Sequence, residues 1–277
     1  MAKQIAYFPG CALEGSAREY DVSTRLVCQA LGVELREVPD WVCCGASSTH
    51  GRGQEIALAL PADALRKAGQ MGLPLVSPCA MCYSRFKLAS LELAHPEARA
   101  RAEAALGQGI GELPPVLHLL QVLADITPRA TVPIDIKVAS YYGCLLVRPP
   151  AASFDDQENP TIMDRIAAGW GAQPVPWAFK TECCGAGMAL ARPDMVARLS
   201  RRILDQARRA GAEAVVVACP MCQANLDLYT GEKDIPVLYI TQLIGLALGM
   251  SLRELLLDRH LISPLPLLRA KGVLAHG

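Results

Sequence analysis

Apolar residues along the chain recur in two kinds of run, and the two kinds alternate. Short runs such as residues 4–11 and 136–144 are rich in apolar and β-branched residues and stop at a Gly-Cys pair, which predicts strands ending in a turn. Longer runs such as residues 16–32 and 193–211 carry Leu, Val and Ile at helical spacing and end with glycine, which predicts amphipathic helices. Strands alternating with helices predict an α/β fold with mainly parallel sheets.

The same order of patterns occurs twice along the chain. Residues 73–82 and 212–222 each read as a buried strand followed by a helix that begins with C-x-x-C. Residues 114–126 and 235–248 each close a repeat with a related strand and helix. We therefore predict two pseudo-symmetric repeats, each with a mainly parallel, Rossmann-like sheet flanked by helices.

The repeats meet near residues 125–134, where two prolines and polar residues interrupt the pattern. We accordingly place one domain at residues 1–130 and a second at residues 131–277. The first repeat contains an extra polar, Ala-rich stretch at residues 91–109, which predicts a surface helix and loop.

Ten of the eleven cysteines follow the duplication. The spacing is C-x31-CC-x34-C-x2-C in the first repeat and C-x38-CC-x34-C-x2-C in the second, so the middle gap is identical. The eleventh cysteine, Cys28, lies outside both signatures on an apolar helix pattern, and we expect it to be a small buried side chain.

Composition narrows the class of protein. Of the 277 residues 52% are hydrophobic and 19% are charged, which predicts a folded protein with a large core. The 27 basic and 27 acidic residues cancel and provide no electrostatic argument for binding nucleic acid or an anionic membrane. Neither a secretory leader nor an apolar stretch long enough to span a membrane is apparent, so we expect a cytoplasmic protein without a membrane span.

Clustered cysteines in such a protein favour metal binding or redox chemistry, because cytosolic thiols stay reduced. Zinc takes four thiolates and leaves one of five unused, and a thioredoxin-like C-x-x-C leaves the adjacent pairs unexplained. A cubane cluster uses four cysteines and leaves the fifth spare, whereas five thiolates fit a larger or distorted iron–sulfur assembly better. The pattern predicts iron–sulfur clusters; their geometry, and a cubane or zinc in one half, stay open.

Longer stretches around the cysteines are more specific. The chain resembles CCG-domain proteins, and more closely the B subunit of heterodisulfide reductase with its bacterial relatives. The likeness lies in YFPGCALEGSAREYD, WVCCGASS, SPCAMCYSR, YYGCLLVRPP, KTECCGAGMALARPD and ACPMCQANLD. In that family each five-cysteine set holds a noncubane four-iron cluster. The resemblance implies one cluster on Cys11, Cys43, Cys44, Cys79 and Cys82, and another on Cys144, Cys183, Cys184, Cys219 and Cys222.

The resemblance also implies a function. It indicates an oxidoreductase subunit that reduces or forms a sulfur–sulfur bond between two clusters, with a disulfide, thiol or persulfide as substrate. No G-x-G-x-x-G fingerprint follows a strand, so electrons must be exchanged with other proteins. As partners the family implies a ferredoxin-like C subunit together with a flavin-containing A subunit. The alternatives are an electron-transfer subunit of another dehydrogenase complex without sulfur chemistry, and a zinc-bound scaffold.

Catalytic side chains beyond the clusters are only weakly indicated. His50 follows the first cysteine pair and could donate a proton to a leaving thiolate, although a surface or capping role explains it equally well. Arg148 begins the loop after Cys144 and could hold an anionic substrate, against the alternative of a solvated loop. Trp41 and Trp177 stand near the cysteine pairs and are expected to shield the clusters.

Overall fold

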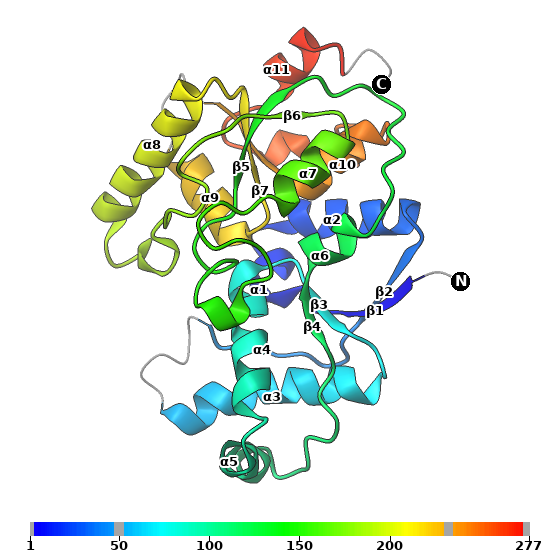
Figure 1. The fold of residues 1–277 in the computed structure, drawn as a ribbon, viewed down its shortest axis with the longest axis vertical. Coiled ribbons are helices and arrows are strands. Elements are labelled where there is room, and N and C mark those ends of the chain that lie inside the picture. Colours follow the sequence, from blue (N-terminus) through cyan, green and yellow to red (C-terminus); the bar gives the residue numbers. More distant parts are fainter. Residues whose placement is uncertain (1–2, 47–52, 230–234, 274–277) are drawn as a thin grey trace.

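The computed structural model describes residues 3–46, 53–229 and 235–273, and it contains two halves of the same architecture (Figure 1). The first half consists, in chain order, of β1 (Lys3–Tyr7), α1 (Gly10–Glu14), α2 (Arg18–Ala30), β2 (Val33–Glu37), α3 (Gln54–Gln70), β3 (Leu75–Ser77), α4 (Ala80–Glu92), α5 (Pro96–Leu106), β4 (Val116–His118) and α6 (Leu119–Ala124). The second half consists of β5 (Lys137–Tyr141), the 3-10 turn η1 (Pro150–Ala152), α7 (Ile162–Gly169), β6 (Gln173–Pro174), η2 (Ala186–Met188), α8 (Pro193–Arg209), β7 (Ala214–Val217), α9 (Pro220–Leu228), β8 (Val237–Tyr239), α10 (Ile240–Ala247), η3 (Leu257–Arg259) and α11 (Leu265–Ala270).

Each half has one four-stranded sheet, and the strand order is the same in both. The orders are β2-β1-β3-β4 and β6-β5-β7-β8, and every pairing is parallel. In each sheet the chain goes from a central strand (β1 or β5) to the neighbouring strand on one side (β2 or β6). It then crosses to the strand on the other side of the central strand (β3 or β7). Such a switch point, at the carboxyl ends of the strands, is where open α/β sheets bind ligands. The predicted α/β fold with two similar halves is confirmed.

The apolar patterns of the sequence explain which faces are buried. All four residues of β7 are buried, because a parallel sheet covered by helices has no solvent face and reads as a continuous apolar run. Helix α8 instead has one buried face, formed by Val196, Ser200, Ile203, Leu204 and Ala207. The helices predicted at residues 16–32 and 193–211 are α2 and α8.

Helix α5 is the extra element predicted within residues 91–109. It packs along α3 and buries Ala98 and Ala102, whose small side chains allow a close approach. It ends at Gly107, whose left-handed conformation terminates the helix. The helix lies at the outer end of the first half, where it covers α3 (Figure 1).

Two helix pairs make the most extensive contacts between the halves. Helix α2 packs on α10, and α6 packs on α7. Because α2 corresponds to α7 in the repeat and α6 corresponds to α10, the duplication relates the two contacts. At the α2–α10 contact the rings of Tyr20 and Tyr239 stack with centroids 4.1 Å apart, and Ser23 Oγ lies 2.7 Å from Thr241 Oγ1.

The predicted boundary at residue 130 falls between α6 and β5. The assignment of residues 1–130 and 131–277 as separate domains stays a prediction. Within the described ranges, no helix combines the length and the apolar character needed to cross a membrane.

Candidate metal centre

The cysteines lie at the carboxyl ends of the central strands. Cys11 follows β1 in the short helix α1, and Cys144 follows β5. Cys79 follows β3 and is the N-cap residue of α4, while Cys219 follows β7 and is the N-cap residue of α9. The helices predicted to begin with C-x-x-C are therefore confirmed. Their N-termini place thiols where the helix dipole favours negative charge.

The cysteines of the first half form a group with a buried side and an exposed side. The Sγ atoms of Cys44 and Cys82 lie 3.2 Å apart, and both residues are buried, as is Cys79. Cys43 contacts Cys11, which is exposed to solvent. The three chain positions of this half thus reach one group.

The second half repeats this arrangement. Sγ–Sγ distances are 3.7 Å between Cys184 and Cys222 and 3.9 Å between Cys144 and Cys183. Cys184 and Cys222 are buried, whereas Cys183 is exposed. The side-chain amide of Asn225 donates toward the Cys184 carbonyl oxygen at 3.3 Å and toward its Sγ at 3.6 Å. Asn225 was not identified from the sequence.

A glycine precedes the first cysteine of each group for a steric reason. Gly10 and Gly143 have φ of +74° and +66°. A Cβ atom would lie 3.1 Å from Cys82 Sγ at the first position and 3.0 Å from Cys222 Sγ at the second. Both the backbone conformation and the space therefore require glycine. The repeated Gly-Cys pair was the sequence signal for this close approach.

The two groups touch. The thiol of Cys79 lies close enough to that of Cys219 for the two to interact, and this proximity raises the pKa of Cys79. Hydrogen bonds with Cys222 and with Cys79 hold the pKa of Cys219 well below its ordinary value. Two sets from separate sheets therefore meet at the contact between the halves, through the cysteines at the ends of β3 and β7.

Burial and the close spacing of the thiols raise the pKa of some cysteines and lower the pKa of others. A hydrogen bond with Cys82 lowers the pKa of Cys44 to about 7, and one with Cys144 lowers the pKa of Cys183 to about 6. Burial, followed by the proximity of Cys43, raises the pKa of Cys11 to about 11. The lowered pKa values favour the thiolate form of Cys44 and Cys183, which is the form that binds metals.

Several thiolates in one buried group repel each other, so the set is favourable only with cations among the sulfurs. This donor chemistry fits iron–sulfur clusters, which thiolates hold. Among the described residues, no group of three Cys, His, Asp or Glu side chains is arranged to hold a single metal ion.

Two tyrosines missed in the sequence lie beside the contact between the sets. Tyr20 and Tyr239, the stacked pair at the α2–α10 contact, are both buried, and both lie close enough to Cys79 and Cys219 for those thiols to raise their pKa in addition to burial. The Tyr20 hydroxyl donates to the Pro78 carbonyl at 3.1 Å, next to Cys79. These rings therefore form part of the buried surroundings of the two sets.

The structure places the predicted Arg148 on the loop that follows Cys144. Its guanidinium donates to Glu158 Oε1 at 3.3 Å and to the Thr181 carbonyl at 3.4 Å, and its side chain is 47% exposed. His50 lies outside the described residues. Neither position establishes a catalytic role, so both stay predictions.

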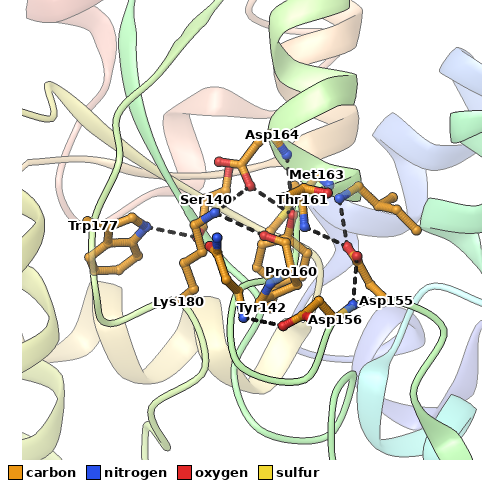
Figure 2. A network of polar contacts seen from close by, with 12 residues as sticks. Ser140, Tyr142, Asp155, Asp156, Pro160, Thr161, Met163, Asp164, Trp177 and Lys180 are labelled. Carbon is orange, nitrogen blue, oxygen red and sulfur yellow. Dashed lines mark hydrogen bonds and ion pairs between the residues drawn. The ribbon is translucent and has the colours of Figure 1, made fainter.

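The loop carrying Arg148 is held by a polar network (Figure 2). The buried Lys180 donates to the Pro160 carbonyl at 2.9 Å and to Asp164 Oδ2 at 3.0 Å. Tyr142 donates to the same Asp164 oxygen, and Asp155 accepts from two backbone N–H groups at the start of α7 (Figure 2). Hydrogen bonds therefore hold the loop in a defined conformation, although its sequence is polar.

The other singled-out residues pack around the sets. Trp41 stacks edge-on against Phe8 and donates to Glu37, and Trp177 donates to the Ser140 carbonyl at 3.1 Å. Both are partly buried against the core, and their shielding role stays a prediction. Cys28 is fully buried in α2, and burial raises the pKa of its thiol to about 12.

Comparisons with known proteins agree with this arrangement. The family model of the cysteine-rich domain CCG matches residues 5–87 and 138–227. The chain is 33% identical to the 8-methylmenaquinol:fumarate reductase membrane anchor subunit of Wolinella succinogenes, over 95% of this chain and 98% of that protein. It is 31% identical to the B subunit of the ferredoxin/F(420)H(2)-dependent CoB-CoM heterodisulfide reductase of Methanosarcina acetivorans, over 95% and 94%. A hypothetical protein from Helicobacter pylori has the same fold, with a TM-score of 0.75 and 14% identity, over 94% of this chain and 52% of that one.

Proposed function

Because the chain belongs to the family of CCG cysteine-rich domain proteins, we propose that it is an iron–sulfur subunit of an oxidoreductase complex. The observation that carries the proposal is the contact between Cys79 and Cys219, which sets two five-thiol groups side by side. One noncubane four-iron cluster would be held by Cys11, Cys43, Cys44, Cys79 and Cys82, and the other by Cys144, Cys183, Cys184, Cys219 and Cys222.

The proposed reaction is reduction or formation of a sulfur–sulfur bond at this contact. Cleavage follows RS–SR′ + 2 e⁻ + 2 H⁺ → RSH + R′SH, so it needs two electrons. When bound, the clusters supply one electron each. A disulfide, thiol or persulfide fits this chemistry, and the same residues serve either direction. The relative from Methanosarcina acetivorans is named as part of a heterodisulfide reductase, which supports this substrate class.

The chain's own residues hold and enclose the reacting centre. Tyr20 and Tyr239 exclude water on the inner side, while the exposed Cys11 and Cys183 leave the outer side accessible. Arg148, on the loop that follows Cys144, would attract an anionic group of the substrate. His50, which follows the first cysteine pair in the sequence, is the proposed proton donor.

Electrons would be exchanged with other members of the complex. The proposed partners are a ferredoxin-like C subunit together with a flavin-containing A subunit. None of the eleven cysteines, which all lie within the described ranges, forms a disulfide, and the reducing cytoplasm is the proposed location.

A second candidate function is electron transfer in a complex with a different substrate. It is favoured by the relative from Wolinella succinogenes, which is named as part of a fumarate reductase and which matches over almost its whole length. In this case the two adjacent groups relay electrons, and no sulfur compound reacts between them.

Metal content tests the iron–sulfur proposal. Protein purified without oxygen should contain iron and acid-labile sulfide for two four-iron clusters, and Cys44→Ala and Cys184→Ala should each lose about half of that iron, since each removes a ligand of one half. Cys28→Ala, a buried cysteine outside both sets, is the matched control and should keep all of it. Stoichiometric zinc without visible absorption would contradict the proposal.

Activity separates the two candidate functions. Holoprotein reduced by a viologen dye should reduce small disulfides to thiols, with two dye molecules oxidised per bond cleaved. Protein that holds both clusters, is reduced by the dye and leaves every disulfide and persulfide intact would favour the electron-transfer function.

A further inference from the structure

The outer face of α8 is a strip of positive charge. The helix carries two exposed aspartates, Asp194 and Asp205, and five exposed arginines, Arg198, Arg201, Arg202, Arg208 and Arg209. At helical spacing these arginines fall on one side, opposite the buried face. Arg198, Arg201 and Arg209 have no hydrogen bond or ion pair with any part of the chain that the structure describes. The whole chain has a formal net charge of zero, so this face concentrates positive charge.

The corresponding helix of the first half, α3, differs from α8 in its net charge and in being covered by another helix. In α3 two acidic and two basic residues balance, and Arg66 and Lys67 both pair with Asp63, at 2.7 and 2.8 Å. Helix α5 packs along α3, and no residue from 57 to 69 is exposed. In the second half the chain passes from α9 to β8 with no helix between them among the described residues. The duplication thus left α8 uncovered.

The helix that carries this charged face packs with its opposite, buried side against the turn of the second cysteine set. Gly185 ends the turn of Cys183 and Cys184, and a Cβ atom there would lie 3.0 Å from Val196 Cγ2 and 3.3 Å from Leu199 Cδ1, both on α8. Between the turn and the helix lie two exposed apolar side chains, Met188 (42%) and Leu190 (100%). Exposed apolar side chains beside unpaired arginines have the composition of a protein-binding site.

We propose that this α8 face, formed by Arg198, Arg201, Arg202 and Arg209 with Met188 and Leu190, binds the acidic surface of an electron-transfer protein. The inference rests on the proposed function, because it makes the exposed Cys183 side of the second set the point of electron exchange. In each encounter the partner loses one electron and the second set's cluster gains it, or the reverse.

An acidic protein fits this face better than an anionic membrane. All the cations of α8 are arginines, whose planar guanidinium matches a carboxylate through two hydrogen bonds. The two aspartates lie among them, and Arg208 lies 3.6 Å from Asp205. A mixed pattern selects a partner with complementary charges, whereas binding to anionic lipid is strengthened by each additional cation and weakened by each carboxylate.

The test measures binding of anaerobically purified holoprotein to an immobilised, acidic two-cluster bacterial ferredoxin. We expect Arg198→Glu/Arg201→Glu to lower the association rate constant about tenfold at low ionic strength, and the difference to vanish at about 500 mM NaCl, where charges are screened. The matched control is Arg36→Glu/Arg101→Glu, which changes the net charge equally at two exposed arginines away from α8. The control should bind at the wild-type rate, within about twofold.

Equal rates for the variant and the control would overturn the proposal. Wild-type binding to phosphatidylglycerol vesicles that the α8 variant loses, with no binding to ferredoxin, would also overturn it and assign the face to a membrane.

Reduction by dithionite distinguishes a failure of the docking site from a failure of the proposed iron–sulfur function. Protein that takes up electrons from dithionite at the wild-type level, but from reduced ferredoxin about tenfold more slowly in the α8 variant, supports both. Protein without iron–sulfur clusters would remove the proposed function, while the binding comparison would still decide the docking site.

Discussion

At the residue scale, the cysteine groups depend on neighbours that carry no reactive group. Gly10 and Gly143 let the backbone pass within a methyl group's distance of Cys82 and Cys222. Asn225 donates to Cys184, and such hydrogen bonds to a ligand sulfur orient it and adjust the potential of what it binds.

Gly143→Ala tests the steric part of this arrangement. The new Cβ would lie 3.0 Å from Cys222 Sγ at a φ of +66°, so we expect the sulfur to shift and iron in the second half to be lost, about half of the total. Gly211→Ala is the control, because Gly211 has a φ of +82° and no atom within 4 Å of its would-be Cβ. Iron and sulfide analysis of the two variants decides the point. Equal iron content in both variants would contradict the steric explanation. Alanine would then differ from glycine at both positions only by the backbone strain of a positive φ, about 1 kcal/mol.

At the element scale, the last helix of each half begins in the same way. The backbone N–H of His118 donates to Gln121 at the start of α6, and that of Tyr239 donates to Gln242 at the start of α10. His118 Nδ1 also accepts from Leu120 N at 3.2 Å, and its Nε2 bonds to the Pro78 carbonyl at 3.0 Å. The buried His118 thus packs within the core and also caps α6.

Stability should depend on pH through His118. Burial lowers the pKa of His118 to about 4, from an ordinary value of 6.5. Between these values the unfolded chain binds a proton that the folded protein does not, so stability falls as pH decreases from 6.5 to 4, by at most about 3 kcal/mol. His118→Asn keeps a capping acceptor but does not titrate.

The variant should therefore be less stable than the wild type at pH 7, by about 1 kcal/mol for the lost bond to Pro78, and this gap should close as the pH falls. Denaturant unfolding of both proteins at several pH values measures the gap. A gap that stays constant from pH 7 to pH 4 would show that His118 is protonated equally in both states.

At the scale of the whole molecule, the α2–α10 contact between the halves lies beside the place where the two cysteine sets meet. Helices α2 and α10 bring Tyr20 and Tyr239 together, with their rings 7° from parallel, beside the thiols where the two sets touch. The packing that joins the halves is therefore also the packing that sets the distance between the two groups.

A double-mutant cycle measures this contact. We expect Tyr20→Leu and Tyr239→Leu each to destabilise the protein, and the double variant to lose about 1 kcal/mol less than the sum, because either change alone already removes the stacking. The free energies of unfolding of the four proteins provide the coupling. Strictly additive losses would mean that the rings fill space without interacting across the halves.

The local structure and the duplication follow from the amino-acid sequence alone. Hydrophobic period, Gly-Cys turns and C-x-x-C helix starts are encoded by neighbouring residues, so β1, α8 and the beginnings of α4 and α9 could be predicted. The spacing of the ten cysteines likewise indicated two equivalent groups, because a repeated gap needs no knowledge of the fold.

How the two groups meet, and which residues surround them, depends on the tertiary fold. The contact of Cys79 with Cys219, the stacking of Tyr20 on Tyr239 and the approach of Gly143 to Cys222 join residues that are far apart in the chain. No local pattern encodes such pairs, since they depend on how two sheets of the same strand order are placed against each other. The exposed arginine face of α8 also becomes apparent only from the fold, where α5 covers the corresponding helix α3 and no such helix covers α8 among the described residues. The sequence of a polar helix face is the same whether a partner protein or water contacts it.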